Sequence, residues 1–367
     1  MRARRICLLA LALALIAPAF ARAEAPPGPR LAFVRLIDRR SHPPSLDLLS
    51  ADPAGAAVQL LTGTSRAGGT PPLEGFSWSP DGETLAIGTV TGTDFAHVLD
   101  NDELDLFLTA ADGSGLRQLT AFPDTPGEVS DDAVAPTFSA DGRTVYFARV
   151  HNLLHSTIWA IGTDGGGPRQ LTSDHVGRGW FFDIPGSVSP AGDELAFTRI
   201  KCTRKAGCQS SVRSLSLATG AERLIARRAI DPAYSPDGQR LALASYRGHH
   251  PLINSNELLP VTDLYVLDTA AGTLQRMTRT RRVSEGHPSW DPSGQRIAFS
   301  RGPSSFPMFL GETDAEISGR LLQINPDGSC PTLMFRRAIR QGPFFGRDFW
   351  QPAWQPGPGR GAGPISC

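Results

Sequence analysis

A short phrase of turn-forming residues recurs along this chain, and it constrains the fold more than any other feature of the sequence. Each copy carries Ser or Asp, then Pro or Ala, and closes on glycine: Phe76–Gly82, Pro136–Gly142, Gly186–Gly192, Pro232–Gly238 and Pro288–Gly294. In such a phrase Ser or Asp accepts a hydrogen bond from the turn backbone, proline fixes φ, and glycine takes a positive φ. Each copy therefore predicts a tight β-hairpin turn.

Short runs rich in β-forming residues follow every turn phrase. The runs expected as second strands are Leu85–Thr89, Val145–Arg149, Leu195–Arg199, Leu241–Ser245 and Ile297–Arg301. A third and a fourth run, joined by a turn that contains glycine, come next, as in Asp105–Thr109 and Arg117–Thr120. The glycines that close the phrases are 46 to 60 residues apart. This spacing is typical of the four-stranded blades of a β-propeller.

The two chain ends complete the repeat. Leu31–Arg35, Leu46–Ser50 and Val58–Thr62 supply second, third and fourth strands, with no first strand ahead of them. Pro352–Gly357 is a degraded copy of the turn phrase at the far end. We therefore predict an all-β fold, a six-bladed β-propeller over residues 31–357, closed by pairing of this C-terminal first strand with the N-terminal strands.

The aromatic residues of the turn phrases have two possible roles, packing between blades or stacking on a ligand. We favour packing between blades, because each aromatic residue recurs at the same place in the repeat. The residues concerned are Phe76, Trp78, Phe138, Tyr234, Trp290 and Trp354.

The repeat resembles a known family. Ser-Pro-Asp-Gly turns such as Ser79–Gly82, the Leu-Ala-Phe type of strand, and the Gln-Leu-Thr ending at Gln118–Thr120 are similar to the TolB-type, or PD40 (WD40-like), propeller repeat. The resemblance covers about residues 31–357, and it implies a six-bladed propeller in the periplasm. TolB itself carries an α/β domain ahead of its propeller, and we expect no counterpart of that domain here.

The N-terminus has the pattern of a secretory signal peptide. Arg2, Arg4 and Arg5 precede an apolar run, Ile6–Ala17, and a small-residue cleavage pattern ends at Ala23. We predict a signal peptide at 1–23, cleaved after Ala23, a linker at 24–30, and a Gly/Pro-rich tail at 358–367. The apolar run is shorter than the ~20 residues of a membrane-spanning helix. A periplasmic or secreted protein without a transmembrane segment is therefore expected.

Charge excludes one class of partner. Without the predicted leader the chain holds 32 basic and 36 acidic side chains, so it lacks the basic excess typical of nucleic-acid binding. We expect no nucleic-acid partner, and we expect a monomer.

Because the four antiparallel strands of each predicted blade alternate in direction, the connections between them lie on two opposite faces of the propeller. The turns between first and second strands, and between third and fourth strands, lie on one face, which we call the turn face. The loops between second and third strands and between blades lie on the other, the long-loop face, which collects the long insertions: Val90–Leu104, Ala121–Ala135, Ser173–Pro185, Ile200–Ser211, Tyr246–Thr262, Gly302–Gly319 and Arg336–Gln351. Because long loops on a rigid scaffold carry most binding sites, we expect the functional surface there.

The candidate binding residues are histidines, acids and an arginine of the long-loop face. They are Asp94, His97, Asp131, Asp132, His175, Arg178, His249, His250, Glu285 and His287, with His151 and His155 nearby. His287 stands immediately before Pro288 and is expected near the axis. A similar histidine position binds metal in oligogalacturonate-lyase-like propellers, which this chain resembles through the shared repeat alone.

These residues leave three functions open. The leading interpretation is a non-enzymatic scaffold that binds a protein or a cell-envelope polymer through its long-loop face. The alternatives are a metal-assisted polysaccharide lyase or hydrolase that uses His287, Glu285 and the loop histidines, and a small-ligand module at the channel. We expect no resident cofactor, with a divalent cation as the one candidate, and we identify neither catalytic residues nor metal ligands. A serine hydrolase is disfavoured, because no Gly-x-Ser-x-Gly sequence occurs.

Four cysteines remain after the leader, and three pairings of them are possible. Cys202 and Cys208 fall in one predicted loop, whereas Cys330 and Cys367 both fall on the turn face. We therefore predict the disulfides Cys202–Cys208 and Cys330–Cys367, the second holding the tail against the last blade.

Overall fold

The structure is a computed structural model of the chain. It describes residues 28–38, 45–55, 59–62, 73–90, 104–122, 131–151, 155–173, 179–203, 207–247, 261–281, 283–302, 319–335, 348–357 and 360–367. All regular elements in these ranges are β-strands, so the predicted all-β class is confirmed. The same ranges hold no helix with the length and apolar character needed to cross a membrane. The predicted leader, residues 1–23, lies outside them.

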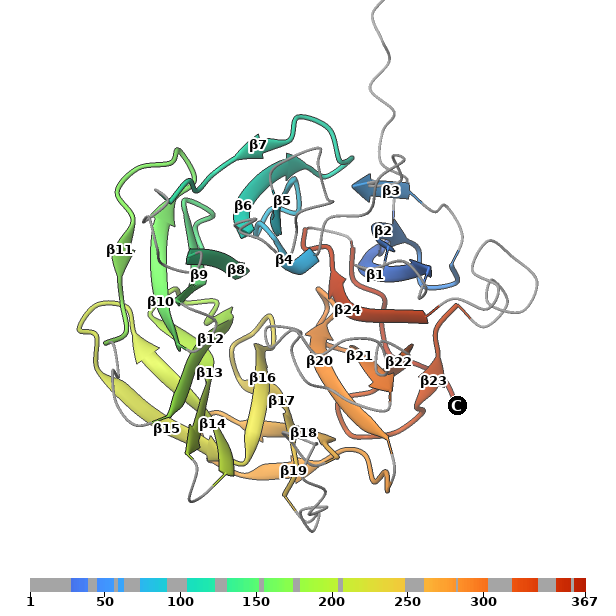
Figure 1. The fold of residues 1–367 in the computed structure, drawn as a ribbon. Coiled ribbons are helices and arrows are strands. Elements are labelled where there is room, and N and C mark those ends of the chain that lie inside the picture. Colours follow the sequence, from blue (N-terminus) through green and yellow to red (C-terminus); the bar gives the residue numbers. More distant parts are fainter. Residues whose placement is uncertain are drawn as a thin grey trace, which may run out of the picture.

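The strands run in chain order from β1 to β24, as labelled in Figure 1. The first twelve are β1 (Leu31–Asp38), β2 (Ser45–Ala51), β3 (Gln59–Thr62), β4 (Leu73–Trp78), β5 (Thr84–Val90), β6 (Leu104–Ala110), β7 (Arg117–Gln118), β8 (Asp131–Phe138), β9 (Thr144–His151), β10 (His155–Gly162), β11 (Arg169–Gln170) and β12 (Trp180–Val188). The others are β13 (Glu194–Thr203), β14 (Gly207–Ser216), β15 (Glu222–Arg227), β16 (Ala229–Tyr234), β17 (Arg240–Ser245), β18 (Asp263–Asp268), β19 (Leu274–Arg276), β20 (Ser284–Trp290), β21 (Ile297–Gly302), β22 (Arg320–Ile324), β23 (Thr332–Leu333) and β24 (Asp348–Trp354).

The repeated phrases form the tight turns that their residues predict. In the first turn, the N–H of Gly82 donates to the carbonyl of Ser79 at 2.8 Å. The Ser79 hydroxyl accepts from the N–H of Thr84 at 2.9 Å and donates to the Asp81 carboxylate at 2.6 Å. Gly82 has φ +73°, and the closing glycines of the other four phrases lie between +69° and +75°. The turn chemistry inferred from the sequence is confirmed.

The strands pair in groups of four consecutive first, second, third and fourth strands. Four-stranded sheets form from β24-β1-β2-β3, from β4 to β7, from β16 to β19 and from β20 to β23. Strands β8 to β11 and β12 to β15 make up one eight-stranded sheet. Figure 1 shows the groups arranged around a common centre, with the first strand of each group innermost. The first strands therefore surround the axis of the molecule.

The two ends of the chain meet in one sheet. Strand β24 pairs antiparallel with β1, with Leu31 opposite Trp354 and Ala32 opposite Ala353. The degraded turn phrase thus takes the place of a first strand beside the N-terminal strands, as its sequence predicts.

One strand pairing joins two predicted blades and is not expected from the repeat of four strands per blade. The start of β12 runs parallel to β10, with His155 opposite Phe181 and Ser156 opposite Phe182. The N–H of Asp183 donates to the Ser156 hydroxyl at 3.1 Å, and that hydroxyl lies 3.0 Å from the Asp183 carbonyl. Two groups that the sequence predicts as separate blades are therefore joined at their long-loop ends.

The hydrophobic core is divided into clusters between neighbouring groups of strands. Trp78 packs with Val34 of β1 and Leu85 of β5, and Trp290 packs with Val266 of β18 and Phe299 of β21. Phe138 and Trp354 have equivalent positions in two further clusters. The aromatic residues of the phrases thus pack between blades, as predicted, and each group is stabilised mainly by its neighbours.

Both predicted disulfides are present, but the first lies in a different element from the one expected. Cys202 and Cys208 face each other across the hairpin of β13 and β14. The segment Ile200–Ser211, expected as a long loop, is therefore mostly strand. The predicted loops Ala121–Ala135 and Ser173–Pro185 also end in strand, because β8 begins at Asp131 and β12 begins at Trp180.

The second disulfide holds the C-terminal tail on the turn face. Cys367 is bonded to Cys330. Between Gly357 and this disulfide, the guanidinium of Arg296 donates to the Ala362 carbonyl at 2.7 Å, and Asn325 exchanges hydrogen bonds of 3.0 and 2.8 Å with Ile365. The tail therefore covers the turn-face end of the sheet formed by β20 to β23.

Adding a methyl group at Gly82 tests the contact between neighbouring turns. A Cβ at this positive-φ position would overlap the Pro356 carbonyl oxygen, whereas at Gly220, also at positive φ, no atom lies within 4 Å. We expect Gly82→Ala to lower the free energy of unfolding by about 2 kcal/mol or more. The control Gly220→Ala should cost about 1 kcal/mol, from backbone strain alone. Urea unfolding of both variants provides the comparison, and equal losses would contradict this turn contact.

Candidate functional site

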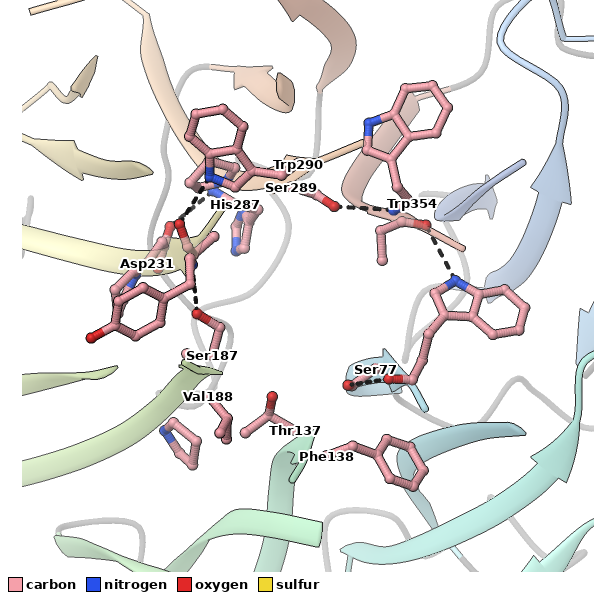
Figure 2. Close-up of a pocket in the computed structure, with 18 of the residues that line it drawn as sticks. Ser77, Thr137, Phe138, Ser187, Val188, Asp231, His287, Ser289, Trp290 and Trp354 are labelled. Atoms are coloured by element: carbon pink, nitrogen blue, oxygen red, sulfur yellow. Dashed lines mark hydrogen bonds between the residues drawn. The ribbon is translucent and has the colours of Figure 1, made fainter. Parts of the chain in front are cut away.

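A cavity of about 660 Å³ lies along the axis, and it is the candidate functional site. Its wall is made by the repeated phrase itself, because each group contributes the same stretch of its first strand and the turn that follows. The stretches are Gly75–Trp78, Ala135–Ala140, Ile184–Pro190, Ile230–Pro236, His287–Trp290 and Gln351–Trp354, with Pro80, Pro292 and Pro356 from the turns. Figure 2 shows these residues around a central space, with the rings of Trp290 and Trp354 directed outward. We call this cavity the axial pocket.

Each first strand carries a β-bulge. The register of the first two strands shifts between Leu73 and Phe76 in the second group, and at the equivalent place in the others. At the bulge, Ala135, Asp231, His287 and Gln351 have φ values between +49° and +54°. Non-glycine residues rarely adopt this left-handed conformation, and strained backbone of this kind is concentrated at functional sites. We call these four residues, with Gly75, the bulge ring.

Hydrogen bonds between neighbouring groups hold the bulge ring in place. The N–H of Asp231 donates to the Thr198 hydroxyl at 3.0 Å, and the N–H of His287 donates to the Asp231 carboxylate at 3.0 Å. The N–H of Gln351 donates to the Ser300 hydroxyl at 3.0 Å. Three of the four strained residues, Asp231, His287 and Gln351, are therefore held by a side chain of the preceding group.

The pocket wall contains hydroxyl, carboxylate, imidazole and amide side chains as well as prolines. Tyr234 donates its phenol proton to Glu194 at 3.1 Å, and burial, followed by the nearby Glu194 charge, raises the pKa of this tyrosine. His287 Nδ1 and Gln351 Oε1 are buried, and no described residue forms a hydrogen bond with either atom. The wall thus combines prolines and small side chains with polar side chains, and these two polar atoms lie buried behind its surface.

Glu285, expected to act beside His287, is buried and bonded to Arg301. Its carboxylate is fully buried, accepts 2.8 and 2.5 Å hydrogen bonds from the Arg301 guanidinium and binds the Thr278 hydroxyl. Burial raises the pKa of Glu285, and the Thr278 hydrogen bond and the Arg301 charge oppose the shift. Although Glu285 and His287 share strand β20, only His287 lines the pocket.

The acids and histidines of β8 to β10 form a separate cluster. Asp131 pairs with both Arg149 and His151, and Asp132 accepts from the N–H of Leu104 at 3.0 Å. His155 lies opposite His151 in the pairing of β9 and β10. This cluster is at the long-loop end of its strands, and none of its members lines the axial pocket.

The remaining candidates, Asp94, His97, His175, Arg178, His249 and His250, lie outside the described residues. In the part of the chain that is described, no group of three or more His, Cys, Asp or Glu side chains is arranged to hold a metal ion.

The bulge ring is the part of the site that sequence reasoning missed. Its available signal is the dipeptide X-Pro at Ala135-Pro136, Asp231-Pro232, His287-Pro288 and Gln351-Pro352. A residue before proline ordinarily prefers the extended region, so this signal predicts regular strand and not a left-handed residue.

Comparisons with known proteins identify the fold. No protein-family profile matches the chain, and no curated protein matches it in sequence. The crystal structure of TolB from Acinetobacter baumannii is similar, with a TM-score of 0.59 and 19% identity over 89% of this chain and 67% of that one. A TolB-type structure from Agrobacterium tumefaciens has a TM-score of 0.53 at 17% identity, over 83% of this chain and 88% of that one.

A third similar structure is hydrazine synthase from Kuenenia stuttgartiensis. Its TM-score is 0.64 at 12% identity, and the match covers 93% of this chain and 48% of that one. At these identities the likeness shows the fold alone. The chain therefore has a TolB-like β-propeller fold, as its repeat predicts.

Replacing Ala135 by glycine tests the strain in the bulge ring. An alanine in the left-handed conformation destabilises the folded state by roughly 1–2 kcal/mol, and glycine removes this strain. Glycine in turn loses more backbone entropy on folding, which costs roughly 0.5–1 kcal/mol. We therefore expect Ala135→Gly to raise the free energy of unfolding slightly, by up to about 1 kcal/mol. The control Ala148→Gly, at a buried position of regular strand, should lower it by about 1 kcal/mol or more. If urea unfolding showed that both variants are destabilised equally, the claim that Ala135 is strained would be wrong.

Proposed function

We propose that this chain is an exported, six-bladed TolB-like β-propeller that works as a scaffold for binding a protein or a cell-envelope polymer. In this proposal residues 1–23 are a signal peptide, 24–30 a linker, 31–357 a propeller closed by the β24–β1 pairing, and 358–367 a tail. The mature protein is a monomer in the periplasm or outside the cell. The grouping of strands in fours, the pairing of β24 with β1 and the two disulfides support these assignments.

The axial pocket carries the binding role. Its volume of about 660 Å³ lies within the range of ligand sites, roughly 300–1,000 Å³. Its wall comes from every group of strands, with the strained residues of the bulge ring toward the long-loop face and the prolines of the turns toward the turn face. A partner that contacts the long-loop face can place a segment in the pocket, where prolines and small side chains supply apolar contact and hydroxyl side chains such as Ser77 and Thr137 supply polar contact.

A photo-crosslinking side chain at Ser77 tests this role in the living cell. Ser77 lines the pocket (Figure 2), whereas the control position Thr219 lies in an exposed turn at the periphery. We expect illumination to give a specific crosslinked product from Ser77 and none from Thr219. Adding Ser187→Trp, which fills part of the same pocket, should remove this product while the melting temperature shows that the protein remains folded. The same product from both positions, or one that Ser187→Trp leaves unchanged, would contradict binding in the pocket.

The second candidate function, a metal-assisted lyase or hydrolase acting on a polysaccharide, is favoured by one observation. His287 Nδ1 is buried in the pocket wall with no described hydrogen-bond partner, and an imidazole nitrogen in that state could take a metal ion.

Melting temperatures with and without metal separate the two functions. A bound ion at 100 times its dissociation constant stabilises a protein by about 2.7 kcal/mol, which thermal unfolding detects. For a scaffold we expect the same melting temperature in EDTA and in excess Ca²⁺, Mn²⁺ or Zn²⁺, both for the native sequence and for His287→Ala. A rise with one ion that His287→Ala abolishes would favour the metal-dependent enzyme instead.

A further inference from the structure

The exposed charges of the described residues are divided between the two faces. All exposed acidic side chains that the structure describes lie in the turns of the turn face: Asp81, Glu83, Asp112, Asp141, Asp164, Asp193, Asp237, Asp268 and Asp327. On the long-loop face, the described acids are buried or half-buried, as with Asp183, whose carboxylate is bonded to Arg199. Exposed cations remain there. The turn face also carries exposed arginines (Arg117, Arg143, Arg169 and Arg223), but fewer than its nine exposed acids, so among the described residues the exposed charge is net negative on the turn face and positive on the long-loop face.

Four exposed arginines follow one another along the long-loop ends of β15, β17 and β19. Arg227 ends β15 and Arg228 follows it, Arg247 lies just beyond β17, and Arg279 lies between β19 and β20. We call these four residues the arginine strip. Arg227, Arg247 and Arg279 form no ion pair with any described residue, so their charge is available to a partner.

Two buried tyrosines hold the backbone of the arginine strip. The Arg228 guanidinium lies 4.9 Å from the ring centroid of Tyr246, and the Tyr246 hydroxyl lies 3.2 Å from the N–H of Ser210. The Tyr265 hydroxyl donates to the Arg247 carbonyl at 2.9 Å. Burial raises the pKa of Tyr265, and the charges of Arg276, Arg247 and Arg279 oppose the shift. Arg228 and Arg247 of the strip are therefore in contact with buried tyrosines.

An exposed tryptophan lies on the same face. Trp180 begins β12, opposite Cys202 of the disulfide-closed hairpin, and it is 42% exposed. Gly179, immediately before it, has no room for a side chain, because a Cβ there would overlap the Cys202 carbonyl oxygen. The position of Trp180 is thus fixed by close packing, and its ring nevertheless reaches solvent.

We infer that the long-loop face docks on an anionic lipid surface, with the arginine strip against the phosphate headgroups and Trp180 at the interface. Basic residues close to such a surface attract it, and tryptophan is enriched where protein meets the headgroup region. This inference goes beyond the proposed function, because it requires nothing in the axial pocket.

The charge division favours a lipid surface over a compact acidic partner. A small anion or an acidic peptide would contact the strip alone, and the charge of the opposite face would not matter to it. An extended anionic surface attracts the long-loop face and repels the acid-bearing turn face, so the whole molecule is oriented. The strip also spans the rims of two neighbouring sheets, and none of its residues lines the axial pocket, which suits many equivalent headgroups.

Vesicle sedimentation with the mature protein tests the inference. The probes are vesicles of phosphatidylcholine alone and vesicles with 30 mol% phosphatidylglycerol, at low and at physiological salt. We expect binding to the anionic vesicles only, weakened by salt. Arg227→Gln/Arg247→Gln/Arg279→Gln should lower the partition coefficient at least about tenfold. The matched control is Arg117→Gln/Arg143→Gln/Arg169→Gln, which removes the same charge from exposed arginines of the turn face and should leave binding unchanged.

Three outcomes would overturn the inference. No binding to anionic vesicles would exclude a lipid surface, and equal losses in the two triple variants would show that only net charge matters. Binding of soluble polyglutamate through the strip, without vesicle binding, would identify an acidic polypeptide as the partner. Trp180→Ala provides an independent readout, because it should weaken vesicle binding without changing its dependence on salt. None of these outcomes bears on crosslinking in the axial pocket, so the proposed function is tested separately.

Discussion

The pairing of β24 with β1 is the interaction on which the other features depend. A twisted sheet of four short strands has little core of its own, and in this chain the apolar side chains lie between neighbouring groups of strands. The cluster that contains Leu31, Phe33 and Leu49 is completed by Trp354 of β24 and by Ala298 and Leu321 of the preceding sheet. The two chain ends must therefore meet before this cluster can form, and the Cys330–Cys367 disulfide holds the tail at the same place.

The pocket follows from the same arrangement. Three strained residues of the bulge ring are held by a side chain of the preceding group, as Asp231 holds the N–H of His287. Strain of this kind persists only where the surroundings over-determine the backbone. Contacts between neighbouring groups of strands thus hold the left-handed residues Asp231, His287 and Gln351 in the pocket wall.

The sequence predicts the repeating parts well, because a tight turn depends on local chemistry. Ser79, Asp81 and Gly82 make the hydrogen bonds and take the φ value that their residue types favour, and Trp78 packs where a repeated aromatic residue should. The bulge ring could not be predicted, because X-Pro sequences favour extended backbone and the left-handed conformation is imposed by tertiary contacts. Glu285 looked available beside His287, yet the partner that buries it, Arg301, lies on the next strand, beyond the reach of a local pattern.

Hydrogen–deuterium exchange across the junction of the two chain ends tests the central claim most directly. The peptides to compare cover Leu31–Arg35, Phe349–Trp354 and, as an internal reference, Ala229–Tyr234. If the β24–β1 pairing closes the ring, the amides of all three should exchange only through global unfolding, with the same protection. Rapid exchange in the two end peptides, with Ala229–Tyr234 still protected, would show an open ring and would contradict the account.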